Sequence, residues 1–369
     1  MRVLMSGGGT GGHVNPAIAI ANIIKKNQPD AEIAFVGTKR GIESKLVPHE
    51  GYKLYHIQIQ GIRRSLSPSN LKTAYLAFKS FGDCKRIIKE FKPDVVIGTG
   101  GYACWPVVRA AASLKIPTIL HESNAVPGFA IKMLEKKADK VFVNFEETIS
   151  QLKYPEKAVR VGNPLRGDFC SVSKAEARKN QGIEGKYNKL ILSLGGSMGA
   201  ERINLEVLEM METYTSKNPD ILHIHCTGTL EYEDTKRMFE EKGLNKYPNL
   251  KLMEYIYDMP EKMAAADIVI NRAGAMTLAE IAVLGKASVL IPSPNVTNNH
   301  QYKNAHVLEK AGAAVLIEEK DLFGGALTKA VKEIAENDEK RRSMEKNVSS
   351  FAVMDAADRI YEYIMETVK

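Results

Sequence analysis

The densest group of residues suited to binding an anion lies at the start of the chain, in GGGTGGHVNPA (7–17). Its five glycines give a ligand close access to backbone N–H groups, which bind phosphate oxygens at the start of a helix. His13 follows them, and an imidazole with a pKa of about 6.5 is suited to accept a proton from a sugar hydroxyl. The pattern predicts an anion-binding loop and then a helix that starts at Pro16.

Two further glycine clusters follow predicted strands, GTGGY (98–102) and LGGSMGA (194–200). One such cluster is weak evidence, because tight turns between a strand and a helix often need a glycine. Three clusters at the same kind of position indicate backbone anion sites. Two lie in the first half of the chain and one in the second, so we expect an anionic ligand between two domains.

Two common phosphate-binding motifs fit this sequence poorly. GGGTGG matches G-x-G-x-x-G, but the dinucleotide fingerprint also needs an acidic residue about 20 residues later, at the tip of the second strand. That strand ends in FVGTKRG (35–41), with no acid at its tip. No glycine precedes Lys-Ser/Thr in the frame of a P-loop. A nicotinamide-dependent oxidoreductase and a P-loop nucleotidase are therefore disfavoured.

A second candidate site lies in RAGAMTLAE (272–280). Ala275, Met276 and Thr277 are expected to begin a helix, with their N–H groups and the positive end of its dipole facing a diphosphate. Glu280 follows one turn later, where its carboxylate can accept both hydroxyls of a ribose. Taken alone, the acid is explained better as stabilising the helix N-terminus. His300 and Gln301 stand at the entry of the next predicted helix.

Short apolar runs alternate with helical patterns and predict two series of parallel βα units. The predicted strands are 2–6, 32–37, 53–59, 95–100, 118–122, 140–144 and 158–162, then 189–196, 222–228, 250–255, 268–274, 287–292 and 313–318. Gly, Asn and Pro interrupt the pattern at 162–169, where we expect a linker. The fold class is therefore α/β, with two doubly wound parallel-sheet domains at 1–163 and 164–345 and a terminal amphipathic helix at 346–369.

The composition is that of a soluble globular protein, with 44% hydrophobic and 26% charged residues. No apolar run approaches the ~18–20 residues that span a bilayer. No signal peptide is apparent, and four cysteines without a CxxC pair suggest reduced thiols in a cytoplasmic protein. Residues 1–163 carry 24 Lys and Arg against 13 Asp and Glu, whereas residues 164–369 carry 27 against 31. The basic first half indicates an anionic partner: nucleic acid, a phosphorylated substrate or a membrane surface.

Two stretches have competing explanations. Residues 69–94 place apolar side chains at helical spacing among lysines and arginines, a pattern that fits either a core-facing helix or a helix seated on anionic lipid. The apolar positions are Leu71, Ala74, Tyr75, Phe78 and Phe81. In HIHC (223–226), both histidines share one face of a strand with no second ligand pair nearby, so a structural role is favoured over zinc binding.

Seven motifs together resemble the MurG family of glycosyltransferases, in order and along nearly the whole chain. They are GGGTGGHVNPA, GTGGY, HESNAVPG, GNPLR, LGGSMGA, RAGAMTLAE and NHQYKNA. The resemblance implies a GT-B fold with two Rossmann-like domains facing a cleft and a C-terminal helix crossing back to the first domain. It also implies an inverting transfer of GlcNAc from UDP-GlcNAc to the muramyl O4 of lipid I, which gives lipid II for the bacterial cell wall.

The same resemblance assigns the site residues. It implies that the Ile256 backbone reads uracil and that Glu280 holds the ribose. The diphosphate is then bound by Ala275, Met276, Thr277, Ser197 and Arg166. His300 and Gln301 meet the GlcNAc hydroxyls or phosphate, and Thr10, Gly11, Gly12 and Asn124 are further donor contacts. On the acceptor side, Gly11 and Gly12 recur with Gly100, Gly101, Tyr102, His121 and Glu122.

For His13 we expect a functional role, either as general base or as a donor to the acceptor phosphate; the alternative is a histidine that caps the helix. No cofactor and no metal are expected, and no nucleic acid. The implied partners are UDP-GlcNAc, the undecaprenyl-diphosphate-linked muramyl pentapeptide, the anionic inner leaflet and other cell-wall synthesis proteins, at the cytoplasmic face of the cell membrane. The alternatives are a diacylglycerol glycosyltransferase, a UDP-GlcNAc 2-epimerase or a non-catalytic sugar-nucleotide binding protein.

Overall fold

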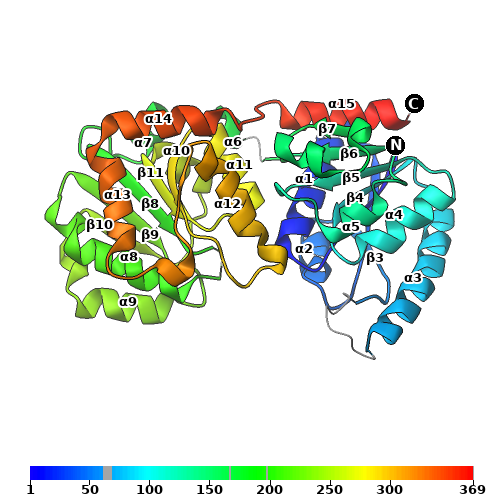
Figure 1. Ribbon diagram of the computed structural model, residues 1–369, viewed down its shortest axis with the longest axis horizontal. Coiled ribbons are helices and arrows are strands. Elements are labelled where there is room, and N and C mark those ends of the chain that lie inside the picture. The colour runs from blue at the N-terminus through cyan, green and yellow to red at the C-terminus, as the bar shows by residue number, and fades with distance from the viewer. Residues whose placement is uncertain (61–68, 166–167, 197, 369) are drawn as a thin grey trace. The chain divides into compact units, whose positions relative to one another are not determined.

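The structure is a computed structural model that describes residues 1–60, 69–165, 168–196 and 198–368, with the backbone alone at 69–74, 77 and 168. The chain forms two compact units, one of Met1–Leu165 with Asp355–Lys369 and one of Arg166–Met354. In each unit helices surround a parallel sheet (Figure 1). All thirteen predicted strands are confirmed, with ends shorter by a few residues in several cases.

The sheet of unit 1 has the order β3-β2-β1-β4-β5-β6-β7, and every neighbouring pair in it is parallel. Its strands are β1 (Arg2–Gly7), β2 (Glu32–Gly37), β3 (Lys53–His56), β4 (Val95–Gly100), β5 (Thr118–Glu122), β6 (Lys140–Val143) and β7 (Ala158–Arg160). Its central strands are apolar on both faces because helices cover both sides. This is the doubly wound arrangement that the sequence predicts.

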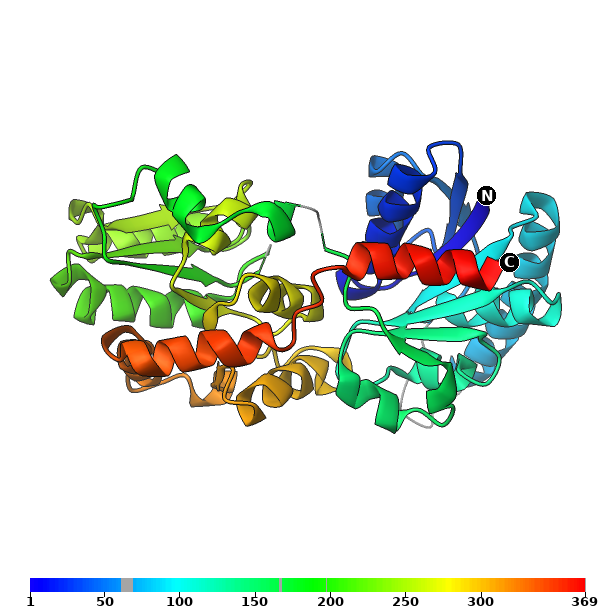
Figure 2. The same ribbon diagram turned by 90° about the horizontal axis from the view of Figure 1, so that it is seen from above.

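The helices of unit 1 divide between the two faces of the sheet. They are α1 (Gly11–Asn27), α2 (Glu43–His49), α3 (Ser69–Phe91), α4 (Cys104–Ser113), α5 (Phe129–Leu134) and α15 (Ala356–Val368). One core cluster joins α1 and α15 to the sheet, through Ile20, Ile360 and Ile364 among others, and another joins α3, α4 and α5. Both chain ends therefore lie in this unit (Figure 2).

Two boundaries differ from the sequence predictions. Helix α1 starts at Gly11 and not at Pro16, because the Thr10 carbonyl already accepts the N–H groups of His13 and Val14, each at 3.1 Å. Pro16 is thus the sixth residue of the helix, where its missing N–H removes one hydrogen bond of the helix. The segment 346–369 is not one helix either: α14 (Asp338–Ser349) ends in unit 2, whereas α15 packs in unit 1.

Unit 2 is built on a parallel sheet of order β10-β9-β8-β11-β12-β13. Its strands are β8 (Lys189–Leu194), β9 (Ile221–Cys226), β10 (Leu250–Met253), β11 (Ile268–Asn271), β12 (Ala287–Leu290) and β13 (Val315–Leu316). Its helices are α6 (Asp168–Ser171), α7 (Lys174–Asn180), α8 (Glu201–Thr213), α9 (Tyr232–Glu241), α10 (Met259–Ala265), α11 (Ala275–Val283), α12 (His300–Lys310), α13 (Ala326–Glu336) and α14. A large core cluster packs α8, α9, α13 and α14 on this sheet.

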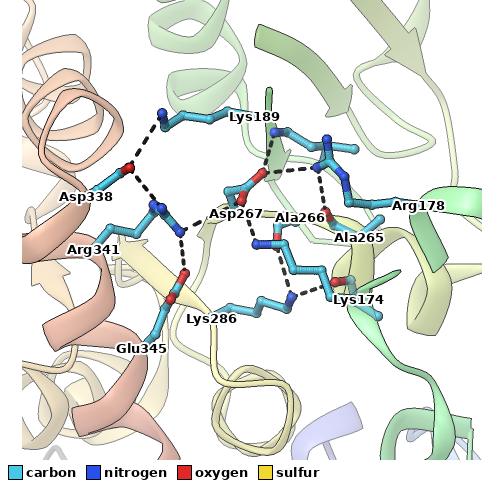
Figure 3. Close-up of polar contacts among 12 residues, drawn as sticks. Lys174, Arg178, Lys189, Ala265, Ala266, Asp267, Lys286, Asp338, Arg341 and Glu345 are labelled. Carbon is cyan, nitrogen blue, oxygen red and sulfur yellow. Dashed lines mark hydrogen bonds and ion pairs between the residues drawn. The ribbon is translucent and has the colours of Figure 1, made fainter. Parts of the chain in front are cut away.

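A buried carboxylate ties the amino ends of these strands to the surrounding helices. Asp267, directly before β11, accepts the N–H of Leu190 at 2.7 Å and pairs with Lys174 at 2.6 Å. It also pairs with Arg178 at 3.3 Å and Arg341 at 3.9 Å (Figure 3). One acidic side chain thus connects β8, α7 and α14.

The two histidines of HIHC take part in a buried chain of hydrogen bonds. The Ser193 hydroxyl lies 2.9 Å from Nε2 of His223 and 2.9 Å from Nδ1 of His225. The Asn204 side-chain oxygen lies 3.1 Å from Nε2 of His225. Burial lowers the pKa of His225 to about 4, so the ring is neutral. These contacts agree with the structural role that the sequence favours.

Candidate active site

In each sheet the strand order reverses between two central neighbours, β1 and β4 in unit 1 and β8 and β11 in unit 2. Ligands of such sheets bind outside the carboxyl ends of the strands at this switch point. The loops that follow these four strands are 8–10, 101–103, 195–200 and 272–274. Each unit therefore carries glycine-containing loops at the place where ligand binding is expected.

The first three glycines of the N-terminal loop are explained by packing. A Cβ atom on Gly7 would lie 2.1 Å from Oγ1 of Thr99, and one on Gly9, where φ is +88°, would lie 2.8 Å from the ring of Tyr102. A side chain at either position would force the neighbouring loop away. In this part of the loop, contacts with the neighbouring loop therefore require glycine, and a ligand does not.

Gly11 and Gly12 are different, since a Cβ atom there would make only ordinary contacts, at 3.7 and 3.8 Å. They are the first two residues of α1, and N–H groups at the start of a helix have no carbonyl partner one turn earlier. Together with the helix dipole, this makes the start of α1 suitable for an anion. Gly11 and Gly12 are therefore the candidates for the predicted anion-binding backbone.

His13 is half-buried in the first turn of α1. Its Nδ1 lies 3.1 Å from the Thr10 hydroxyl oxygen, and its carbonyl accepts a hydrogen bond from the Thr99 hydroxyl at 2.6 Å. If Nδ1–H donates to Thr10, the neutral ring has its lone pair on Nε2, as a base needs. The other tautomer makes Nε2 a donor, as a phosphate ligand needs. Both functional roles remain compatible with this geometry.

The structure brings Gly100 next to His13 and Gly101 next to Gly8. A Cβ atom on Gly100, where φ is +103°, would lie 2.7 Å from Cδ2 of His13, and one on Gly101 would lie 2.1 Å from the Gly8 carbonyl oxygen. These two glycines therefore allow the β4 loop to pack against the N-terminal loop. Tyr102 completes the contact, with its ring beside the glycine-rich backbone.

The expectation that His121 and Glu122 line the site surface is wrong. His121 is 0% exposed, and its Nε2 lies 3.1 Å from the Gly162 carbonyl oxygen. Burial lowers the pKa of His121 to about 4, which keeps the ring neutral. Glu122 is also buried and accepts the N–H groups of Asn124 at 2.9 Å and Gly128 at 2.7 Å. Both side chains are buried beneath the loop that follows β5, whereas Asn124 in that loop is half-buried.

In unit 2, α11 begins at Ala275 after Gly274, as predicted. Its first turn contains no acidic side chain, because Glu280 is the sixth residue of the helix. Since the dipole effect falls off within the first turn, the helix-stabilising explanation of this acid is disfavoured. Glu280 is half-buried, one turn beyond the amides of Ala275, Met276 and Thr277.

Three other predicted donor residues follow strands of the same sheet. Ile256 comes after β10 and has a buried side chain. His300 begins α12, and its Nδ1 donates to the Thr297 carbonyl at 2.8 Å, so the neutral ring presents Nε2 as an acceptor. The Gln301 side-chain oxygen accepts the Ser293 N–H at 2.8 Å, which leaves its NH₂ group as the donor for a ligand. Arg166 and Ser197 lie outside the described residues.

Three supporting side chains were missed by the sequence analysis. Glu43, from the start of α2, accepts the Gly9 N–H at 3.0 Å. Asn204 donates to the Thr227 carbonyl at 3.2 Å, and Asn304 to the Ala273 carbonyl at 3.3 Å. The sequence signal for Glu43 is that it is the first acidic residue after the tip of β2.

Comparison with known proteins extends along the whole chain. Residues 3–143 match the glycosyltransferase family 28 N-terminal domain, and residues 190–360 match its C-terminal domain. The chain is 47% identical to a UDP-N-acetylglucosamine–N-acetylmuramyl-(pentapeptide) pyrophosphoryl-undecaprenol N-acetylglucosamine transferase of Thermoanaerobacter sp., over 99% of both chains. It is 44% identical to the protein of that name from Acetivibrio thermocellus, over 100% of this chain and 99% of the other.

Solved structures give the same result. The crystal structure of MurG from Acinetobacter baumannii has a TM-score of 0.80 and 26% identity, and covers 99% of both chains. A UDP-GlcNAc 2-epimerase from Neisseria meningitidis has a TM-score of 0.65 at 16% identity, which shows a shared fold alone. The two Rossmann-like units, the two family domains and the full-length relatives agree. The chain belongs to glycosyltransferase family 28, has the GT-B fold and is related to the MurG-type enzymes.

Proposed function

We propose that this enzyme transfers N-acetylglucosamine from UDP-GlcNAc to the muramyl O4 of undecaprenyl-diphosphate-linked muramyl pentapeptide, lipid I, and so makes lipid II. The observation that carries the proposal is the full-length identity of 44–47% to transferases of that name. In the transfer, O4 forms a bond to C1 of GlcNAc as the bond from C1 to the diphosphate breaks. UDP leaves, the configuration at C1 inverts, and the O4 proton passes to a base.

The activity is tested with labelled UDP-GlcNAc and a short-chain lipid I analogue. The expected product is a β-1,4-linked disaccharide on the lipid diphosphate. Epimerised donor without acceptor would instead identify the 2-epimerase alternative, and transfer to diacylglycerol would identify the lipid glycosyltransferase. Donor binding without any product would leave a non-catalytic sugar-nucleotide binding protein.

Most donor contacts are assigned to unit 2, whereas Thr10, Gly11, Gly12 and Asn124 belong to unit 1. The N–H groups at the start of α11 and its dipole suit the diphosphate, and Glu280 suits the two ribose hydroxyls. His300 presents an acceptor nitrogen to a GlcNAc hydroxyl, whereas Gln301 presents a donor to an oxygen. The proposal includes departure of UDP without a metal ion, because fixed N–H groups with Arg166 take up the developing charge.

Replacement of Glu280 by alanine is expected to raise the donor KM about 10–100-fold while the acceptor KM stays near that of the wild type. Two charge-assisted hydrogen bonds to the ribose, each worth ~1.5–3 kcal/mol before desolvation, are lost. Steady-state kinetics with each substrate varied in turn measure this. Glu240→Ala, an exposed acid of α9, is the control. An unchanged donor KM with a much lower melting temperature would show that Glu280 serves stability alone.

We also propose that unit 1 binds the cytoplasmic face of the cell membrane through α3. Tyr75 and Phe78 are 67% and 80% exposed on this helix, which also carries the exposed cations Lys79 and Arg86. Exposed aromatic rings among cations suit an anionic lipid surface. In the described part of the chain, no helix is long and apolar enough to cross a membrane. The membrane binding that we propose is peripheral.

Not all of the apolar side chains of α3 face outward. Phe81 packs against the core of unit 1, with Lys85 Nζ 4.7 Å from its ring centroid. For Phe81 the core-facing alternative is therefore favoured, because its ring is already partly covered by protein. Leu71 and Ala74 lie outside the residues whose side chains are described.

The double variant Tyr75→Ser/Phe78→Ser is expected to float less with vesicles of phosphatidylglycerol or cardiolipin, and added salt should weaken binding further. Transfer to a soluble acceptor analogue should stay the same. Phe323→Ser removes a ring of unit 2 that is 62% exposed and is the control. Unchanged flotation of the double variant would place the membrane contact elsewhere.

A further inference from the structure

Glu43 is a buried carboxylate beside the glycine-rich loop of unit 1. It is 1% exposed, and its Oε1 accepts both the N–H and the hydroxyl of Thr38, at 2.9 and 2.8 Å. Its Oε2 accepts the N–H of Gly9 at 3.0 Å. Burial by itself raises the pKa of this carboxyl, but the N–H groups of Gly9 and Thr38 bring it below its ordinary value. The side chain is therefore a carboxylate anion, and it accepts all three of these hydrogen bonds.

The surrounding backbone is shaped to admit this carboxylate. A Cβ atom on Gly8 would lie 2.9 Å from Glu43 Oε1, and one on Gly37 would lie 2.6 Å from its Cγ. One on Gly41 would lie 2.1 Å from Oε2. Gly8, Gly37 and Gly41 thus leave room for one acidic side chain. This side chain contacts the N-terminal loop as well as the connection between β2 and α2.

The contact with Gly9 leads directly to His13. Gly9 precedes Thr10, which is the residue before α1. The Thr10 carbonyl accepts the His13 N–H at 3.1 Å. The Thr10 hydroxyl oxygen lies 3.1 Å from Nδ1 of the His13 ring. A displacement of Gly9 therefore moves both the backbone and the hydroxyl that orient this imidazole.

We propose that Glu43 is a positioning residue for sugar transfer: it fixes Gly9 and thereby sets Thr10 and the His13 imidazole. The inference rests on the functional role proposed for His13. Glutamine has the shape of glutamate, but its NH₂ group must face either the Gly9 N–H or the Thr38 donors. One donor then meets another, and the loop has to move.

The test compares Glu43→Gln with the wild type. We expect kcat to fall about 10–100-fold, since small misplacements of a catalytic group have effects of this size. The affinity for UDP should remain near wild type, because the residues assigned to uracil, ribose and diphosphate belong to unit 2. Glu50→Gln makes the same chemical change at the exposed end of α2 and is the matched control, with wild-type kcat expected.

A double-mutant cycle separates positioning from a general structural effect. If Glu43 acts through His13, Glu43→Gln should cause little further loss of kcat in a His13→Ala background. An equal fold-loss in both backgrounds, or wild-type kcat for Glu43→Gln, would overturn the inference. A wild-type enzyme that forms no disaccharide would instead contradict the proposed function.

A milder variant covers the case in which Glu43→Gln does not fold. Thr38→Val removes the hydroxyl that donates to Glu43 and accepts the Gly41 N–H at 3.1 Å, and leaves the carboxylate in place. We expect a several-fold loss of kcat that disappears in the His13→Ala background. A loss that persists unchanged in that background would overturn the inference.

Discussion

Replacement of His13 by alanine is expected to lower kcat by about 10²–10⁴-fold while UDP-GlcNAc binding stays intact. The imidazole lies at the start of α1 between the Thr10 hydroxyl and the Gly100 backbone, next to the amides of Gly11 and Gly12. This loss is the one expected if His13 is the proposed base that removes the proton from the attacking O4. Single-turnover transfer rates and calorimetric binding of UDP measure the two parts of the prediction.

His13→Asn distinguishes the two functional roles. An asparagine amide can replace a hydrogen-bond donor to phosphate in part, but it cannot accept a proton from O4. Substantial rescue relative to His13→Ala would therefore rule out the base and support the phosphate ligand. His49→Ala, at the exposed end of α2, is the control and should keep wild-type kcat. A loss of stability without a loss of kcat in folded His13→Ala would identify a purely structural histidine.

Replacement of Asp267 by asparagine is expected to destabilise unit 2 by about 3–5 kcal/mol, the usual cost of leaving buried partners of an ion pair uncompensated. Lys174, Arg178 and Arg341 lose their shared anion, and an amide NH₂ group faces these cations. Asparagine can still accept the Leu190 N–H, so the variant tests the charge and not the shape. Urea unfolding measures the free energy of unfolding.

Asp338→Asn is the matched control for this network. Asp338 pairs with Arg341 at 2.9 Å, but its carboxylate is exposed, so we expect a much smaller change in stability. Equal effects of the two substitutions would contradict the importance assigned to the buried position. Bound UDP should raise the midpoint of both variants, because a ligand of the folded state stabilises it.

The sequence by itself determined the strands, the doubly wound fold class and the glycine clusters at strand ends. Parallel strands covered on both faces are continuous apolar runs, so a short window is enough to find them. The signal for the start of α11 at Ala275 was equally local, since a glycine turn follows a strand there. The resemblance to the MurG family rests on such local motifs, which the full-length relatives confirm.

Only the tertiary structure decided which of these residues reach a surface. His121 and Phe81 have the residue types of a site and of a lipid contact, but partners far along the chain bury them wholly or in part. Glu43 meets Gly9 across 34 positions, a contact that no local pattern contains. Burial and hydrogen-bond partners depend on which distant segments the sheet order brings together, whereas periodicity reports only on neighbours along the chain.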